Sequence, residues 1–318
     1  MPQPPAAPRF ATIDIGTNSV LLLVAERQAD GRFTAVSERA EITRLGRGVD
    51  QSRVLSPAGM EDTLRVLEAF AQEARALGAR DIAVSATSAA RDAHNGKDFL
   101  EAARTRAGLS VEIISGALEA QLSFAAVHAD FAAGAAGPLL VIDIGGGSTE
   151  FIYGAAGDAQ GQVAFRHSFD VGAVRLTERL VRADPPQASE RAQMEALLAQ
   201  TFSALPPPPA GASLVGVAGT VTTLYAVQHR VEPYDAERVH AGTLSLAELE
   251  RLTDLLWRLP LAERRALPGL QPKRADVVPA GALILLCAVR ALGLTSLRVS
   301  DRGLRWGLLA HRFGGVPS

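Results

Sequence analysis

The sequence predicts an α/β protein with two domains, and three observations carry this prediction. The chain of 318 residues is about twice the usual length of one domain. Apolar runs typical of buried strands alternate with helical patterns, and this order restarts after a small-residue linker at 132–138. Nearly the same segment also occurs twice, as Thr-Ile-Asp-Ile-Gly-Thr-Asn-Ser at 12–19 and as Val-Ile-Asp-Ile-Gly-Gly-Gly-Ser at 141–148. We therefore expect domains at 1–130 and 131–302.

In the first half, continuous Val, Ile and Leu runs indicate strands that are buried on both faces. Ser56 is a suitable N-cap, and Pro57 suits the first position of the helix that follows. The expected elements are strands at 10–14, 20–26 and 33–42, the helix after Ser56, a strand at 81–85, a helix at 97–107, a strand at 111–115 and a helix at 119–131.

The second half repeats this pattern after the linker. Ser245 and Glu248 match a capping box, in which the two side chains bond each other's backbone N–H at a helix start. The expected elements are strands at 139–144, 148–154 and 163–171, helices at 174–181 and 189–205, a strand at 214–218, helices from Gly219 and from Ser245, an apolar helix at 277–292, a strand at 296–300 and a helix at 303–312.

Composition narrows the class of protein. The formal net charge is −2 and aromatic residues make up 5%, so the chain has neither a global basic field nor many stacking platforms for nucleic acid. The single cysteine, Cys287, lies in an apolar run and excludes an internal disulfide. Residues 1–6 lack the features of a signal peptide, and the apolar stretch at 277–289 is shorter than a membrane span. We expect a cytoplasmic protein with no nucleic-acid or membrane partner.

Each copy of the repeated segment ends a strand in an aspartate, Asp14 or Asp143, and a glycine turn follows at once. Such a turn exposes backbone N–H groups that bind phosphate oxygens, while the carboxylate can hold a divalent cation or its water. Taken singly, each loop also fits an ordinary hairpin turn, since turns often need Asp and Gly. The repetition, and the three glycines at 145–147, favour phosphate binding, because close approach of a ligand commonly explains such a run.

Further short motifs occur in a fixed order along the chain. They are Arg-Leu-Gly-Arg-Gly-Val at 44–49, Ala-Thr-Ser-Ala-Ala-Arg-Asp-Ala-His-Asn at 86–95, Ile-Ser-Gly at 114–116 with Glu119, Gly-Val-Ala-Gly-Thr at 216–220, Lys-Arg-Ala-Asp at 273–276 and Asp-Arg-Gly-Leu-Arg at 301–305. With the two loops, this series resembles the exopolyphosphatase/guanosine pentaphosphate phosphohydrolase (Ppx/GppA) family of the actin-like ATPase superfamily, in its short two-domain type. Ala117 and Leu118 depart from the family pattern, in which an acidic residue often precedes the glutamate.

The resemblance implies two actin-like (ribonuclease H-like) domains with a phosphate-binding cleft between them, and a helix at 303–318 that packs back on the first domain. It implies Glu119 as the general base. Read alone, Glu119 also fits a solvated first-turn residue, and Arg91, expected to contact phosphate in catalysis, also fits a surface arginine. The residues expected to bind phosphate are Asp14, Gly16, Thr17, Asn18, Ser19, Gly145, Gly146, Gly147, Ser148, Gly219 and Thr220.

Two carboxylates on either side of the second glycine turn, Asp143 and Glu150, could jointly hold Mg²⁺, which takes a few carboxylates with water and phosphate oxygens. Glu150 equally fits an ordinary strand end. A basic track for a polyanion could form from Arg44, Arg47, Lys273 and Arg274.

These features together predict an exopolyphosphatase, which hydrolyses the terminal phosphoanhydride of inorganic polyphosphate. The alternative within the family is hydrolysis of the 5′ γ-phosphate of guanosine pentaphosphate (pppGpp), which uses the same residues. A kinase of the same superfamily is less favoured because no acceptor carboxylate is evident, and a phosphate sensor without turnover is a further alternative. We also expect a homodimer.

Overall fold

The computed structural model describes residues 7–155 and 163–314, so the first six residues, which the expectation about a signal peptide concerns, lie outside it. The described chain divides into two compact units. The first runs to Leu122 and resumes at Leu304, and the second runs from Ser123 to Gly303. The chain therefore passes from the first unit to the second within one helix, α5 (Gly116–Phe131).

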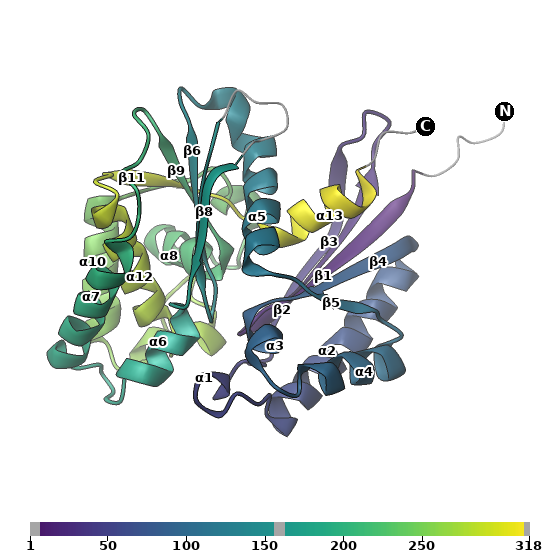
Figure 1. Ribbon diagram of the computed structural model, residues 1–318, viewed down its shortest axis with the longest axis horizontal. Coiled ribbons are helices and arrows are strands. Elements are labelled where there is room, and N and C mark those ends of the chain that lie inside the picture. Colours follow the sequence, from purple (N-terminus) through teal and green to yellow (C-terminus); the bar gives the residue numbers. More distant parts are fainter. Residues whose placement is uncertain (1–6, 156–162, 315–318) are drawn as a thin grey trace. The chain divides into compact units, whose positions relative to one another are not determined.

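The first unit is built on a five-stranded sheet with the order β3-β2-β1-β4-β5 (Figure 1). β1 pairs antiparallel with β2 and parallel with β4. Ala11, Ile13 and Ile15 of β1 lie in the hydrophobic core. Thr12 and Asp14 alternate with them and so face the opposite side of the sheet. The strands are β1 (Arg9–Ile15), β2 (Ser19–Arg27), β3 (Phe33–Ile42), β4 (Ala79–Ala86) and β5 (Val111–Ile113).

Helices cover both faces of this sheet. α2 and α4 lie on the core side, and α13 lies on the other (Figure 1). On that second side, the Thr12 hydroxyl donates a hydrogen bond to the Arg305 carbonyl at 3.0 Å, and the ring of Phe10 stacks on that of Phe313. The helices of this unit are α1 (Val49–Ser52), α2 (Pro57–Ala76), α3 (Ser88–Asp92), α4 (Gly96–Ala107) and α13 (Leu304–Phe313).

Helix α2 begins where the sequence predicts. Ser56 is its N-cap, and the Ser56 hydroxyl accepts a hydrogen bond from the Gly59 N–H at 3.1 Å. The helices α1 and α3 were not expected, because four or five residues are too few to show a helical period.

The second unit contains a six-stranded sheet with the order β10-β11-β9-β6-β7-β8. β6 pairs antiparallel with β7 and parallel with β9, as β1 pairs with β2 and β4. Five strands thus repeat the topology of the first sheet, and β10 is an added edge. The strands are β6 (Leu139–Ile144), β7 (Thr149–Gly154), β8 (Val163–Phe169), β9 (Ser213–Val217), β10 (Thr243–Ser245) and β11 (Ser296–Val299).

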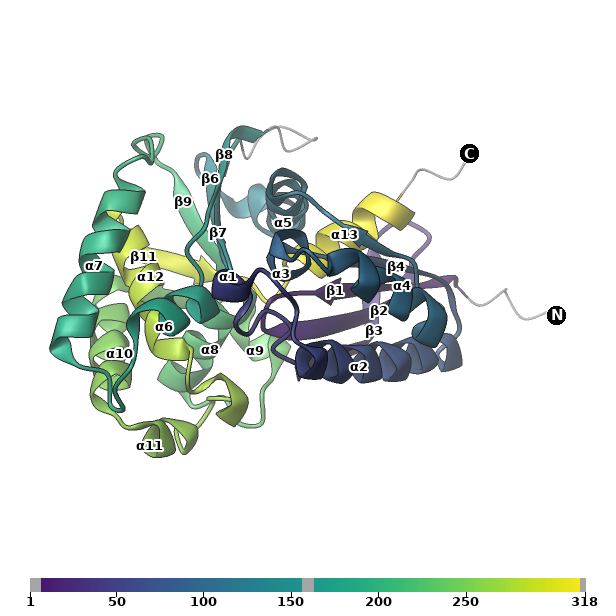
Figure 2. The ribbon, with the colours of Figure 1, turned by 60° about the horizontal axis from the view of Figure 1, so that its bottom comes forward.

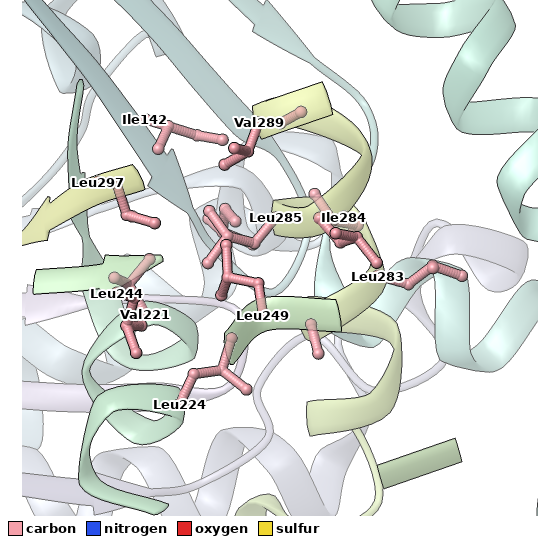
Figure 3. Packing of buried hydrophobic residues seen from close by; sticks show 14 of the residues in the cluster. Ile142, Val221, Leu224, Leu244, Leu249, Leu283, Ile284, Leu285, Val289 and Leu297 are labelled. Atoms are coloured by element: carbon pink, nitrogen blue, oxygen red, sulfur yellow. The ribbon is translucent and has the colours of Figure 1, made fainter. Parts of the chain in front are cut away.

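The core of the second unit forms around helix α12, which packs against α6, α7, α8 and α10 (Figure 2). Leu285 and Val289 of α12 meet Ile142 of the sheet and Leu249 of α10 (Figure 3). Among the described residues, no helix has both the length and the apolar character needed to span a membrane. The remaining helices are η1 (Ala132–Gly134), α6 (Ala173–Leu180), α7 (Ala188–Phe202), α8 (Ala218–His229), α9 (Ala236–Val239), α10 (Leu246–Arg258), α11 (Leu261–Arg265), η2 (Pro272–Arg274) and α12 (Val278–Ala291).

Candidate active site

The first predicted phosphate loop is the tight turn between β1 and β2. The Gly16 N–H donates to the Ser19 carbonyl at 2.9 Å and closes the turn. Thr17 and Asn18 are buried, although both are polar. The Thr17 hydroxyl shares a 2.7 Å hydrogen bond with the Ser88 hydroxyl at the start of α3. Asp14 lies at the end of β1, where it is half-buried and opposite Leu21 in the β1–β2 ladder.

The segment after β3, residues 43–46, is hydrogen-bonded to this loop through its backbone. The N–H groups of Thr43 and Arg44 donate to the Asn18 carbonyl at 3.1 and 3.0 Å, and the Gly46 N–H donates to the Thr17 carbonyl at 2.8 Å. A Cβ atom at Gly46 would overlap the Thr17 methyl group. The sequence suggested 44–49 as a basic segment, and its backbone also has this structural role, which residue types alone do not reveal.

The structure brings the two predicted catalytic residues together within the first unit. Glu119 lies in the first turn of α5, and its side chain is only 11% exposed. Arg91 Nη1 donates to the Ile114 carbonyl at 2.9 Å and lies 3.5 Å from Glu119 Oε2. Glu119 is therefore not a solvated residue of the helix start.

The second loop, Gly145–Gly147, has the same closing hydrogen bond as the first: the Gly145 N–H donates to the Ser148 carbonyl at 3.0 Å. Its carbonyls face the start of α6. The Ala173 N–H donates to the Gly145 carbonyl at 3.0 Å, and Arg175 Nε donates to the Gly147 carbonyl at 2.7 Å.

The Gly146 carbonyl is held in the same way, by the N–H groups of Val174 and Arg175 at 2.9 and 3.0 Å. In a planar trans peptide the N–H points opposite to the carbonyl. The N–H groups of Gly146, Gly147 and Ser148 therefore point away from α6. Consecutive N–H groups arranged in this way form a concave binding site for an anion.

Asp143 and Glu150 are direct partners in the antiparallel β6–β7 ladder, so both side chains lie on the same face of the sheet. They are 7% and 1% exposed. The Ser123 hydroxyl of α5 donates to Asp143 Oδ2 at 2.7 Å, and the Ser168 hydroxyl of β8 donates to Glu150 Oε1 at 2.6 Å. Sequence reasoning missed both serines.

This pair of carboxylates fits a divalent cation. Burial raises the pKa of the Asp143 carboxyl, and the hydrogen bond from Ser123 acts against this rise. Two adjacent buried carboxylates require a proton or a cation to balance their charge. Mg²⁺ binds one or two carboxylates and completes its shell with water and phosphate oxygens. Within 7–155 and 163–314 there is no group of three or more His, Cys, Asp or Glu placed for a metal.

A further predicted segment, Gly219 and Thr220, lies in the first turn of α8, after Ala218 with a positive φ of 68°. A Cβ atom at Gly219 would overlap the guanidinium of Arg274, a residue of the proposed basic track. The absence of a side chain at this position therefore lets a cationic group lie directly against the helix start, where backbone N–H groups also favour an anion.

The fold and these loops define a class of protein. Two sheets share one strand order, and in each the first strand ends in Asp-x-Gly at a turn with the same closing hydrogen bond. This is the plan of proteins with two actin-like domains. The model of the Ppx/GppA phosphatase family matches residues 23–313, and the chain belongs to that family.

Individual relatives agree with this assignment. Exopolyphosphatase 2 of Mycobacterium tuberculosis is 35% identical over 320 residues, which cover 95% of this chain and 98% of that protein. A guanosine-5′-triphosphate,3′-diphosphate pyrophosphatase of Aeromonas hydrophila is 30% identical and covers 97% of this chain, which spans 60% of the relative. The crystal structure of the Aquifex aeolicus Ppx/GppA family member is similar with a TM-score of 0.79 at 32% identity, covering 96% of this chain and 97% of that one. The expected family, the two-sheet α/β fold class and the hydrolase class are thus confirmed.

Proposed function

We propose that the protein is an exopolyphosphatase that removes the terminal phosphate of inorganic polyphosphate, with Glu119 as general base. The observation that carries this proposal is the buried Glu119 carboxylate 3.5 Å from Arg91, in the same unit as the first phosphate loop. The identity of 35% to Exopolyphosphatase 2 extends over 98% of that protein and supports polyphosphate as the substrate class.

In the proposed reaction, a water oxygen attacks the terminal phosphorus and the bridging P–O bond breaks. The products are inorganic phosphate and a polyphosphate one unit shorter. Glu119 accepts a proton from the attacking water and later returns it to solvent. Arg91 binds oxygens of the terminal phosphate, and its hydrogen bond to the Ile114 carbonyl holds the guanidinium in place. Phosphoryl transfer needs mainly such positioning and charge neutralisation.

We propose Mg²⁺ as the cofactor, with Asp143 and Glu150 as its protein ligands. When bound, it neutralises negative charge on phosphate oxygens. The three N–H groups at 146–148, which point away from α6, are proposed to bind phosphate oxygens directly. The first loop contributes the Thr17 and Asn18 side chains as well as its backbone.

Hydrolysis of pppGpp is the second candidate activity. The identity of 30% to the A. hydrophila pyrophosphatase supports it, and the same residues serve both reactions. The homodimer, the cytoplasmic location and the absence of nucleic-acid and membrane partners stay predictions.

The test is Mg²⁺-dependent phosphate release from polyphosphate, pppGpp and ATP, measured in parallel. We expect Glu119→Gln to lower kcat at least about 100-fold, because a general base contributes about 10²–10⁴-fold. The matched control is Glu101→Gln, which changes an exposed helical glutamate that also pairs with an arginine, Arg104. Undiminished release by Glu119→Gln would remove the assignment of the base. Binding without release of phosphate from any substrate would indicate a sensor instead.

A further inference from the structure

We propose that Ser123 and Ser168 are positioning residues that orient the two carboxylates of the metal site, one serine for each carboxylate. This inference rests on the proposed role of Asp143 and Glu150. The bonds are short, at 2.7 and 2.6 Å, and in each the serine hydroxyl donates to a carboxylate oxygen. A hydroxyl that donates to one oxygen of a carboxylate restricts the rotation of the group, and so limits the directions in which the other oxygen can point.

The register of the sheet places these groups in one row. Asp143 is the partner of Glu150 in the β6–β7 ladder, and Glu150 is the partner of Ser168 in the β7–β8 ladder. Residues opposite each other on neighbouring strands share a face. Ser123 reaches the same face from helix α5, where its side chain is fully buried. Each carboxylate thus has its own serine partner: Ser123 of the helix bonds Asp143, and Ser168 of the strand bonds Glu150.

The first unit shows that the fold itself does not require this row. At the positions that correspond in the strand order, Asp14 is opposite Leu21, and Leu21 is opposite Ala40. The same five-strand topology therefore forms there with two apolar residues in place of Glu150 and Ser168. The second carboxylate and its serine are specific to the second unit, which is the unit proposed to hold the cation.

Burial explains why the carboxylates need such partners. A buried carboxylate without hydrogen bonds is costly, and a flexible one holds a cation poorly. Groups that bond a metal ligand from outside commonly change metal affinity about 10–100-fold when they are removed. We therefore expect Ser123→Ala and Ser168→Ala each to weaken cation binding by about 10-fold or more.

The experiment titrates Mn²⁺, as a spectroscopic substitute for Mg²⁺, into the full-length protein without substrate and follows free Mn²⁺ by electron paramagnetic resonance. Ser168→Thr keeps the hydroxyl on a strand that tolerates threonine, so it should retain near wild-type affinity. The matched control is Ser37→Ala, which removes another strand serine that donates to a carboxylate, Glu73, at 2.7 Å. That variant should bind Mn²⁺ like the wild type.

Wild-type affinity in both Ser123→Ala and Ser168→Ala would overturn the inference. Thermal unfolding of each variant shows whether it is folded. If Ser123→Ala does not fold, the comparison of Ser168→Ala with Ser168→Thr tests the inference. Absence of Mn²⁺ binding by the wild type would overturn the metal site and the inference with it. Mn²⁺ binding that depends on the serines, in a protein that releases no phosphate from any substrate, would support the inference and overturn the proposed activity.

Discussion

Close contacts of Gly46 and Thr17 determine the conformation of the first loop, which lies between β1 and β2. Gly46 lies so close to Thr17 that no side chain fits between them, and its N–H also holds the Thr17 carbonyl. Thr17 in turn is tied to Ser88 by its hydroxyl. These contacts hold the loop in one conformation, as the proposed role in phosphate binding requires.

Gly46→Ala should consequently damage the site. The added methyl group must push Thr17 aside, and overpacking of this kind costs about 1–3 kcal/mol. We expect a lower melting temperature and at least about a 10-fold loss of phosphate release, measured on the same preparations. Gly134→Ala is the control, since a Cβ there meets no atom within 4 Å. A destabilised variant with the wild-type rate would show that the first loop does not position the substrate.

For single residues, the sequence identified part of the candidate site. The residue types of both loops, of Glu119 and of Arg91 were identified from motifs. Ser123 and Ser168 were not, because a serine has no distinctive pattern and its partner is set by strand register and helix position. Asp143 and Glu150 were grouped from their spacing, and the ladder shows the physical reason for the grouping: they are direct cross-strand partners.

Among the elements, helix α10 has the clearest local signal. The Glu248 N–H donates to the Ser245 hydroxyl at 3.2 Å, and the Ser245 N–H donates to Glu248 Oε2 at 2.8 Å, as the capping-box pattern predicts. The hydrogen bond from the Ser245 backbone, with that from its hydroxyl, lowers the pKa of Glu248 below its ordinary value of 4.5.

The lowered pKa gives the sign of a pH effect. A carboxylate that is more acidic in the folded state stabilises that state above its unfolded pKa, and this contribution is lost as the pH falls through the folded value. Glu248→Gln should cost about 0.5–1.5 kcal/mol at neutral pH. The difference from wild type, measured by urea unfolding, should shrink as the pH falls below 4.5.

Glu250→Gln on the same helix is the control, because it removes only an exposed ion pair with Arg290. Such pairs contribute about 0–1 kcal/mol. A cost for Glu248→Gln that persists undiminished in acid would show that the charge of Glu248 does not stabilise the cap.

Long elements were predictable from the sequence. Of the short ones, strands β5 and β11 were expected and several others were not. The 20-residue helix α2 has a cap, a proline at its first position and an apolar face. Strand β10 and helix α9 have three and four residues, and tertiary contacts decide their conformation. Helix α5 was expected from Glu119, whereas it begins at Gly116. The earlier start moves Glu119 from the first residue of the helix to its fourth.

For the whole molecule, the repeated segments mark a repeated topology with unequal chemistry. The two sheets share a five-strand order, but the repeated aspartate is opposite a carboxylate only in the second, where Asp143 pairs with Glu150, whereas Asp14 pairs with Leu21. The sequence pattern predicted the repeated topology, because the same order of strands and helices occurs in both halves of the chain. The pattern alone does not place helix α13, far along the chain, on the first domain, because that depends on long-range packing. The family resemblance implied this placement, and α13 lies in the first compact unit.

The division into units predicts where core substitutions act. Leu308 of α13 packs with Ile114 and Leu122 in the first unit, while Leu285 of α12 lies fully buried in the core of the second (Figure 3). Leu→Ala at such sites costs about 2–5 kcal/mol. Local stability differs across a structure, and amide hydrogen exchange reports it. We expect Leu308→Ala to speed exchange in β1 and β4, and Leu285→Ala to speed it in β6 and β9.

Each of these variants is the control for the other, because the chemical change is the same and only the unit differs. If the two units have separate cores, the two exchange maps should scarcely overlap, and Leu308→Ala should leave the amides of β6 and β9 protected. Leu308 is reached only after the chain has completed the second unit, so its effect on β1 is a direct test of the chain path. Uniformly faster exchange in both sheets with either variant would mean that the molecule unfolds as one cooperative unit.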